Sequence, residues 1–187
     1  MMPAVRPRNL RSMTAPADTF DLGTLRLTSG EGRSVDLAVR IEPFELAGGA
    51  YPTQPDPVPV RLDVARMTGD GYSLRIRFDA TLAGACMRCL QPASRDVRVD
   101  AREISQPSAG DPELESPYVI DSILDVAGWA RDALALALGV PASVLCRADC
   151  AGLCPVCGTS LNDAGESHHH DPEPDPRWAK LRELRFE

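Results

Sequence analysis

Cys150-Ala-Gly-Leu-Cys-Pro-Val-Cys-Gly158 is the stretch on which the rest of the chain depends, because it places three thiols and two glycines within nine residues. Few of its side chains can contribute to an apolar core. Its second half, Cys154-Pro-Val-Cys157-Gly158, has the pattern of a metal-binding knuckle, in which two closely spaced thiolates grip one tetrahedral ion. Pro155 stiffens the turn, and Gly158 permits the positive φ that turns backbone N–H groups toward sulfur. The sequence therefore predicts that a bound metal ion stabilises this segment in place of an apolar core.

A second C-x-x-C pair, Cys86-Met-Arg-Cys89, lies far upstream. Two such pairs supply the soft ligands of a closed structural zinc site, which would clamp two distant parts of the chain together. The predicted Zn²⁺ ligands are Cys86, Cys89, Cys154 and Cys157, with Cys150 and Cys146 as alternates. The competing arrangement is local and consists of Cys146, Cys150, Cys154 and Cys157.

Length and composition indicate one ordinary domain with tails. The chain has 187 residues, and 43% apolar residues can supply a core. Apolar runs stay well below the length of a bilayer span, and the N-terminus lacks the hydrophobic region of a signal peptide. These features predict a cytoplasmic protein with no membrane contact. In a reducing cytosol, six cysteines in close pairs favour metal binding over disulfides.

Charge is unevenly distributed along the chain. Residues 61–102 carry eight arginines and five aspartates, a balance of +3, whereas residues 103–187 carry six basic and fifteen acidic side chains, a balance of −9. A basic segment can form a local contact with RNA or an acidic partner, although the whole-chain charge of −7 argues against broad phosphate binding. The alternative is that these arginines only solvate strand faces. The candidate contact residues are Arg75, Arg77, Arg88, Arg95 and Arg98.

Alternating apolar and polar residues predict antiparallel hairpins. Residues 19–27 and 34–41 form one candidate hairpin around Gly30-Glu-Gly32, and residues 58–66 and 72–82 form a clearer one around Gly69-Asp-Gly71. The second strand then runs into the Cys86–Cys89 pair, and an alternating segment leaves at residues 95–104. The first cysteine pair is therefore predicted at a hairpin tip.

The period changes at residues 121–139, where apolar side chains recur at helical spacing. Asp121 is the expected cap, and Gly139 followed by Pro141 ends the helix. A helix beside a sheet of hairpins predicts an α+β fold: a curved antiparallel sheet packed on one main helix. A C-terminal cysteine knuckle and a short terminal helix complete this prediction.

The expected organisation has four parts. Residues 1–17 are a flexible leader, and residues 18–162 are a single α+β domain with zinc knuckles at 86–89 and 146–158. Residues 163–174 form an acidic linker, and residues 175–187 form a short docking helix. His168, His169 and His170 lie in the acidic linker, a setting more typical of a solvated loop than of a metal site. Prolines also cluster at residues 41–60, which suggests a linker there.

Motifs for catalysis are scarce. The sequence contains neither a Gly-rich phosphate loop nor a G-x-S-x-G elbow, and its histidines are confined to one triplet. A dithiol oxidoreductase is the main catalytic alternative for C-x-x-C. Reactive pairs normally sit at a helix N-terminus, whereas this pair follows a strand, so ligation fits better. A non-enzymatic protein is predicted, with a zinc-ribbon-like interaction adaptor as a second alternative.

Four segments together resemble the bacterial YceD family, the large ribosomal RNA subunit accumulation proteins. The residues 121–141 resemble the characteristic helical segment of the family. The other matches are to its C-x-R-C-L, C-x-G-L-C-P-x-C-G-x-x-L-N and D-P-R-x-x-x-L motifs, found here as Cys86-Met-Arg-Cys-Leu90, Cys150-Ala-Gly-Leu-Cys-Pro-Val-Cys-Gly-Thr-Ser-Leu-Asn162 and Asp175-Pro-Arg-Trp-Ala-Lys-Leu181.

The resemblance implies a non-catalytic role in accumulation or processing of 23S ribosomal RNA and in assembly of the large ribosomal subunit. It also implies ribosomal RNA or large-subunit ribosomal proteins as partners. Some relatives carry a further cysteine pair after the L-N motif, where this chain has Glu166-Ser-His-His-His170. The departure leaves open whether histidine replaces cysteine at that point.

Overall fold

The structure is a computed structural model that describes residues 16–107, 110–139, 143–164 and 168–170. The leader expected at 1–17 lies almost wholly outside these ranges, as does all of the docking helix expected at 175–187. Within the described ranges no helix has both the length and the apolar character needed to cross a membrane. The elements in chain order are β1 (Thr19–Asp21), η1 (Leu22–Leu25), β2 (Gly32–Val39), β3 (Phe44–Leu46), β4 (Gly49–Tyr51), β5 (Thr53–Gln54), β6 (Val58–Arg66), β7 (Tyr72–Ala85), β8 (Pro92–Ser105), η3 (Pro112–Leu114), β9 (Val119–Ile120), β10 (Ile123–Asp125) and α1 (Val126–Leu138).

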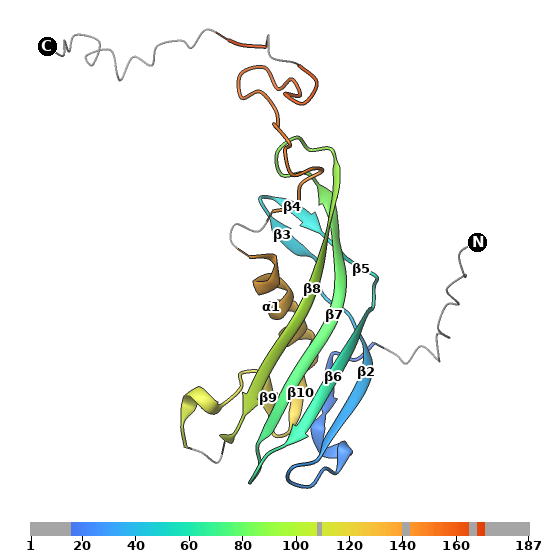
Figure 1. Cartoon of the computed structure of the whole chain (residues 1–187), viewed down its shortest axis with the longest axis vertical. Coiled ribbons are helices and arrows are strands. Elements are labelled where there is room, and N and C mark those ends of the chain that lie inside the picture. The colour runs from blue at the N-terminus through green and yellow to red at the C-terminus, as the bar shows by residue number, and fades with distance from the viewer. Residues whose placement is uncertain (1–15, 108–109, 140–142, 165–167, 171–187) are drawn as a thin grey trace, which may run out of the picture.

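The main sheet is built around β7. Strands β6 and β5 pair with one edge of β7, β8 pairs with the other, and β2 extends the sheet beyond β6, all antiparallel. The β7–β8 pairing runs without interruption from Tyr72↔Ser105 to Ala85↔Pro92. At about 3.3 Å per residue this 14-residue ladder is on the order of 45 Å long. It carries the Cys86–Cys89 turn to one end of the molecule, where the C-terminal cysteine segment also lies (Figure 1).

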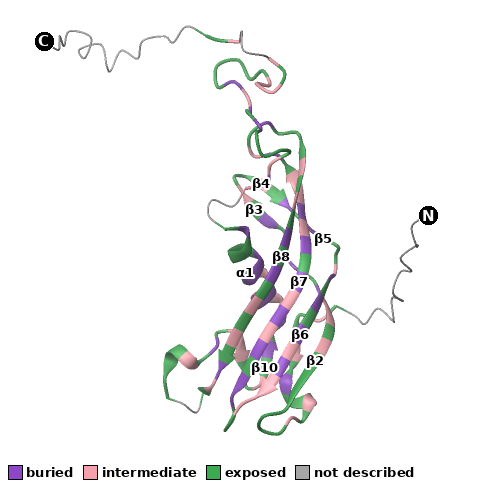
Figure 2. Ribbon diagram, in the orientation of Figure 1, coloured by how far each residue is buried: buried purple, intermediate pink, exposed green. Residues whose placement is uncertain are grey.

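Period-two alternation decides which face of the sheet is buried. In β7 the side chains of Leu74, Ile76 and Leu82 are at most 1% exposed, whereas the intervening positions are polar and face outward. Strand β6 follows the same rule, and Figure 2 shows the resulting stripes along both strands. Burial of each such aliphatic side chain contributes about 1.5–3 kcal/mol, so the inner face supplies most of the apolar stabilisation.

Helix α1 covers the inner face beside β8 (Figure 1). It buries Val126, Trp129, Ala130 and Leu134, as expected for an amphipathic helix packed on a sheet. Gly139, at φ 72°, ends it. The predicted α+β architecture, a curved antiparallel sheet against one main helix, is confirmed.

The helix begins four residues later than its predicted cap would place it. Asp125, not Asp121, caps α1, and its Oδ1 accepts a hydrogen bond from Gly128 N at 2.9 Å. Residues 123–125 instead form β10, which pairs with both β1 and β9. Asp121 and Ser122 have positive φ angles and make the tight turn between β9 and β10.

The first predicted hairpin is wrong, whereas the second is confirmed. The segment at 19–27 does not pair with 34–41. Its strand β1 ends where Asp21 Oδ1 accepts a hydrogen bond from Gly23 N at 2.8 Å, which starts the η1 turn. β1 then pairs with β10, and β2 pairs with β6. The 58–66 and 72–82 segments form β6 and β7 as predicted.

Residues 41–60 are not a simple linker. They form the β3–β4 hairpin and β5, and they bury Phe44 and Tyr51. The Tyr51 hydroxyl donates to Ala85 O at 2.7 Å, and its ring lies so close to Gly84 that a Cβ there would collide with it. This contact braces β7 directly below the Cys86–Cys89 turn.

Candidate metal centres

The turn between β7 and β8 presents two thiols. Cys86 N donates to Gln91 O at 2.7 Å, and Leu90 N donates to Cys86 O at 2.9 Å. Leu90 has a φ of 62°, which closes the turn. Cys86 and Cys89 are both buried, and Arg88 N lies 3.5 Å from Cys86 Sγ. The predicted position of this pair at a hairpin tip is confirmed.

The segment that follows α1 docks on this turn. Met87 N donates to Val144 O at 3.1 Å, and Val144 is fully buried. Two arginines of the hairpin also bind the backbone of this segment. Arg95 Nη1 donates to Ser143 O and Arg88 Nη1 donates to Cys150 O, both at 2.8 Å. These bonds place the next two cysteines of the chain over the turn.

Four sulfur atoms converge as a result. Cys86 Sγ lies 3.8 Å from Cys150 Sγ, and Cys89 Sγ lies 3.5 Å from Cys146 Sγ. All four Sγ atoms are within 4.8 Å of one another. We call Cys86, Cys89, Cys146 and Cys150 the first centre.

The sulfur spacing fits a tetrahedral ion. Four Zn–S bonds of about 2.3 Å at tetrahedral angles separate the sulfurs by about 3.8 Å. A disulfide would require an S–S distance of about 2.05 Å, which neither close pair of the first centre approaches. The first centre therefore has the donor type, number and spacing of a closed structural metal site.

The electrostatics of the first centre also favour a cation. Burial acts to raise the pKa of Cys86, but hydrogen bonds from the backbone of Cys146, Arg88 and Cys89 outweigh it and lower the pKa to about 6. The neighbouring Cys89 thiol raises the pKa of Cys146 to about 12. Thiols this close cannot all ionise without a positive charge among them, and a divalent ion would supply it.

Asn162 supports the first centre from outside its ligands. Its Nδ2 donates to Cys150 Sγ at 3.4 Å, and this contact is the largest cause of the lowered pKa of Cys150. Asn162 Oδ1 accepts from Ala151 N and from Arg147 Nη2, both at 2.8 Å. Side chains that orient a ligand in this way are typical of metal sites.

A second group lies farther along the same segment. Cys154, Cys157, His168 and His170 each offer a ligand atom within 4.8 Å of the others, and we call them the second centre. Cys157 Sγ lies 3.5 Å from His168 Nε2 and 3.3 Å from His170 Nε2. The Thr159 hydroxyl and backbone and the His170 ring lower the pKa of Cys157 to about 6.

The structure does not bring together the four cysteines predicted to share one ion. Cys86 and Cys89 lie with the alternates Cys146 and Cys150, whereas Cys154 and Cys157 lie with two histidines. The local alternative, with all four C-terminal cysteines around one ion, is likewise not formed.

Gly152 explains this division. It has a φ of 84°, and its backbone passes so close to the turn that a Cβ would be 3.1 Å from Arg88 O. The chain therefore turns at Gly152 after delivering Cys150 to the hairpin, and Cys154 starts a separate knuckle. Sequence spacing alone does not reveal this turn, because a glycine between cysteines is compatible with either path.

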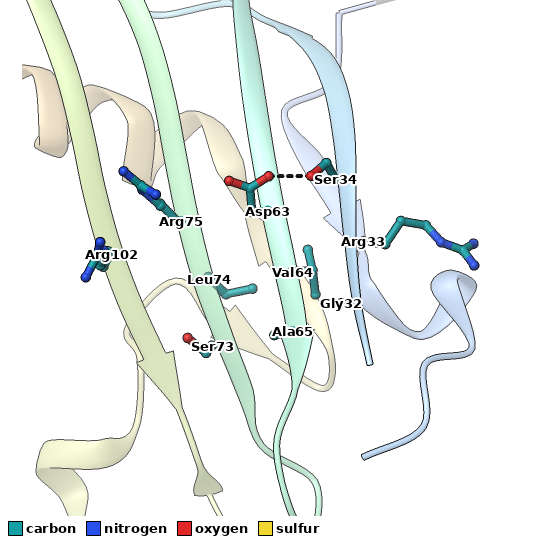
Figure 3. A pocket seen from close by; sticks show the side chains of 10 residues that line it. All are labelled: Gly32, Arg33, Ser34, Asp63, Val64, Ala65, Ser73, Leu74, Arg75 and Arg102. Atoms are coloured by element: carbon teal, nitrogen blue, oxygen red, sulfur yellow. Dashed lines mark hydrogen bonds between the residues drawn. The ribbon is translucent and has the colours of Figure 1, made fainter. Parts of the chain in front are cut away.

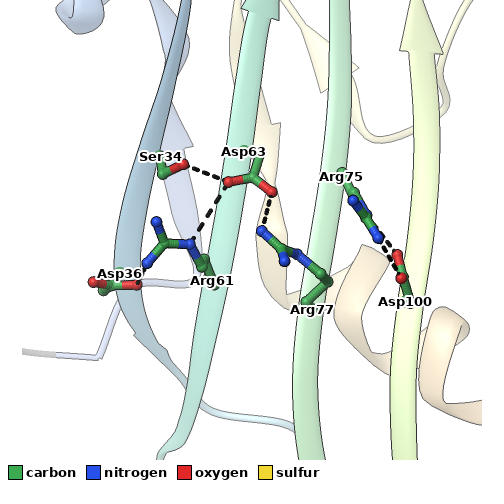
Figure 4. Close-up of polar contacts among 7 residues, drawn as sticks. All are labelled: Ser34, Asp36, Arg61, Asp63, Arg75, Arg77 and Asp100. Atoms are coloured by element: carbon green, nitrogen blue, oxygen red, sulfur yellow. Dashed lines mark hydrogen bonds and ion pairs between the residues drawn. The ribbon is translucent and has the colours of Figure 1, made fainter.

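Of the five candidate contact arginines, three form ion pairs on the outer face of the sheet and two bind the cysteine segment. Arg75, Arg77 and Arg98 lie on the outer face of the sheet and pair with Asp100, Asp63 and Asp79 respectively. Arg61 and Ser34 extend this ladder to β2 through Asp63 (Figure 4). Arg88 and Arg95 instead hold the cysteine segment. The ion-paired part of the outer face thus carries alternating charges.

A shallow hollow of about 460 Å³ lies on this outer face, between β2, β6, β7 and β8. Figure 3 shows Arg75 and Arg102 on one side of it and Asp63 bonded to Ser34 near its middle. Its lining combines arginine, aspartate and serine side chains with Gly32, Val64, Ala65 and Leu74.

Comparison with known proteins gives a family but no structural precedent. The model of the family described as "Large ribosomal RNA subunit accumulation protein YceD" matches residues 74–185. "Uncharacterized protein Rv2926c" of Mycobacterium tuberculosis (strain ATCC 25618 / H37Rv) is 40% identical over 110 residues, which cover 56% of this chain and 51% of that protein. "Uncharacterized protein ML1660" of Mycobacterium leprae (strain TN) is 34% identical over 110 residues, which cover 56% of this chain and 49% of that protein. The chain thus spans about half the length of these curated relatives. No solved structure matches it.

Proposed function

The chain belongs to the YceD family of large ribosomal RNA subunit accumulation proteins, and from this membership we propose that it supports accumulation of 23S ribosomal RNA and assembly of the large ribosomal subunit in the cytoplasm. Its action is non-catalytic. The observation that carries the proposal is the extent of the family match. Residues 74–185 begin in β7 and include β8, α1 and both candidate metal centres.

Zinc is the ion that we propose for the first centre, with Cys86, Cys89, Cys146 and Cys150 as ligands. Four thiolates at tetrahedral spacing are typical of structural zinc, which keeps no coordination position open for a substrate. The ion joins the β7–β8 hairpin to the segment after α1. Its role is therefore to fix the shape of the end of the molecule.

Burial of Cys86 and Cys150 in the first centre argues for ligation over thiol–disulfide exchange at these two thiols. Cys86 and Cys150 are both 0% exposed, so neither sulfur can be attacked by a protein disulfide without opening the fold. A reactive dithiol needs an accessible sulfur. The oxidoreductase alternative would be supported by turnover of a disulfide substrate by the metal-free protein.

The outer face of the sheet is the proposed contact surface for ribosomal RNA or a large-subunit protein. Arg75, Arg77 and Arg98 are the candidate contacts, and Arg98 is the most exposed of them, with 86% of its side chain accessible. Arg88 and Arg95 are assigned to holding the cysteine segment. A partner binds here if its phosphates or carboxylates replace Asp100 and Asp79 as the ion-pair partners of Arg75 and Arg98.

The test is complementation of a strain that lacks the gene. In the deletion strain we expect the levels of 23S ribosomal RNA and of large subunits to fall. Expression of the wild-type protein is expected to restore both levels. Cys86→Ser is expected to fail because it removes a ligand of the first centre. Arg75→Ala/Arg98→Ala is expected to weaken co-sedimentation with large-subunit precursors, and Arg40→Ala, which alters an exposed ion-paired arginine outside the strands, is the matched control.

Unchanged 23S ribosomal RNA in the deletion strain, together with protein that stays at the top of the gradient, would favour the adaptor alternative outside the ribosome.

A further inference from the structure

We propose that Cys154, Cys157, His168 and His170 form a second metal centre, separate from the first, that holds a divalent ion of zinc type through two thiolates and two imidazoles. The evidence is geometric. The four ligand atoms lie within 4.8 Å of one another although the cysteines and the histidines come from different parts of the segment. The inference adds to the proposed function and does not rest on it.

The distances in the second centre match those of a mixed sulfur and nitrogen site. With a Zn–S bond of about 2.3 Å and a Zn–N bond of about 2.0–2.1 Å, tetrahedral ligands place sulfur and nitrogen about 3.5 Å apart. Cys157 Sγ lies 3.5 Å from His168 Nε2 and 3.3 Å from His170 Nε2. The two imidazoles meet edge to face with ring centroids 4.9 Å apart. The Nε2 atom of each ring lies beside the same sulfur, Cys157 Sγ.

The knuckle that carries the two thiols is already shaped. Gly158 N donates to Cys154 O at 2.9 Å, and Cys154 N donates to Thr159 O at 2.8 Å. Gly158 has a φ of 73°, which a glycine adopts without strain. A short bridge between Leu153 and Ser160 closes the base of the turn. The cysteines therefore need little rearrangement to bind an ion.

The two centres are chemically distinct. The first centre supplies four thiolates and the second supplies two, so a divalent ion leaves a formal charge of −2 in the first and of zero in the second. Three of the four ligands are buried in the first centre, whereas only Cys154 is buried in the second. We therefore expect the second centre to lose its ion to a chelator faster than the first.

The test is the metal content of the natively purified full-length protein and of three variants. Wild type is expected to contain two zinc ions per chain. His168→Gln/His170→Gln is expected to contain one, and Cys157→Ser is expected to lose the same ion. His169→Gln changes the histidine between the two proposed ligands and is expected to keep both ions. This matched control separates site geometry from the general affinity of a histidine run.

Cobalt substitution gives a second readout, which does not depend on the number of metal ions measured per chain. Difference spectra between wild type and His168→Gln/His170→Gln loaded with Co²⁺ are expected to show the bands of one tetrahedral site with two thiolates. The remaining spectrum is expected to be that of a four-thiolate site.

Three outcomes would overturn the inference. One is a single ion in wild type that the histidine double variant retains. Another is loss of both ions from that double variant, because the centres would then not be separate. The third is an equal loss in His169→Gln, because the histidines would then bind as an unstructured run. Each outcome differs from failure of the ribosomal role, which the metal content does not measure.

Discussion

The first and second centres both use cysteines of the segment that follows α1, yet only the first is built into the fold. The first centre has two ligands on a hairpin braced by Tyr51 and two on a segment docked by Met87, Arg88 and Arg95. The second centre is a local knuckle closed by nearby histidines. A metal that joins distant parts of a chain stabilises tertiary structure, whereas one that closes a short loop stabilises mainly that loop. The difference predicts effects of very different size.

Loss of a ligand in each centre is the strongest way to test this comparison. Structural zinc contributes on the order of 10 kcal/mol to the folding of small zinc domains. Cys86→Ser is expected to remove the ion from the first centre and to detach the segment at 143–150. The measurement is amide hydrogen exchange at Met87, whose N–H is bonded to Val144 O.

Cys157→Ser is the matched variant in the second centre, and it is expected to leave exchange at Met87 unchanged. Equal loss of protection in both variants would mean that the centres contribute equally to the fold.

Asn162 offers a smaller and more selective perturbation. Loss of a side chain that orients a metal ligand typically weakens metal binding about 10–100-fold. Asn162→Ala removes the contact with Cys150 Sγ and two further hydrogen bonds, so we expect a loss in this range at the first centre. Competition with a chromophoric chelator measures it.

Thr159→Val is the counterpart in the second centre, because the Thr159 hydroxyl lies 3.2 Å from Cys157 Sγ. It is expected to weaken only the second centre. The comparison fails if Asn162→Ala releases the ion of the second centre first.

Much of the fold was predictable from the sequence, and the reason is strand alternation. β6 and β7 alternate cleanly, so their pairing and buried face follow from the side-chain period. The Cys86–Cys89 turn follows because alternating segments flank it. The β1–β10 pairing was not predictable, because three-residue strands contain too few positions to show a period.

The candidate sites were predictable in donor type but not in grouping. The paired cysteines indicate tetrahedral ligation of a metal by thiolates. Their grouping depends on the docking of residues 143–150 by arginine-to-carbonyl hydrogen bonds, which have no sequence signature. The acidic neighbours of His168 and His170 favour a solvated loop and so hide their role as ligands. Their position thirteen or fewer residues after Cys157 was the available signal. Asn162 could have been identified only from its place in the family motif.

The glycines of the two loops test how the path of the chain separates the centres. A side chain at a left-handed φ costs about 1–2 kcal/mol, roughly a tenfold change in affinity if the strain appears only in the bound form. Gly152 and Gly158 both have positive φ, but only Gly152 also approaches another backbone, at 3.1 Å from Arg88 O. Gly152→Ala is therefore expected to weaken the first centre more than Gly158→Ala weakens the second. Titration of each variant with Zn²⁺ measures both affinities, and equal losses would remove Gly152 as the cause of the division.

The smallest expected effect lies in the sheet, away from both centres. Burial acts to raise the pKa of Asp63, but the hydrogen bond from Ser34 and the contact with Arg77 outweigh it and lower the pKa. A carboxylate whose pKa is lowered on folding stabilises the protein above its unfolded pKa, and this stabilisation is lost as pH falls through the folded pKa. Ion pairs this accessible contribute about 0–1 kcal/mol.

Asp63→Asn should therefore lower the free energy of unfolding slightly at neutral pH, and the difference from wild type should vanish in acid. Urea unfolding of both proteins at neutral pH and at successively lower pH, over the range in which both remain folded, measures it. A difference that grows as pH falls would show that Asp63 does not act as an ion-paired carboxylate. The sheet could then not be contrasted with the metal-bound end of the molecule as a region stabilised by ion pairs.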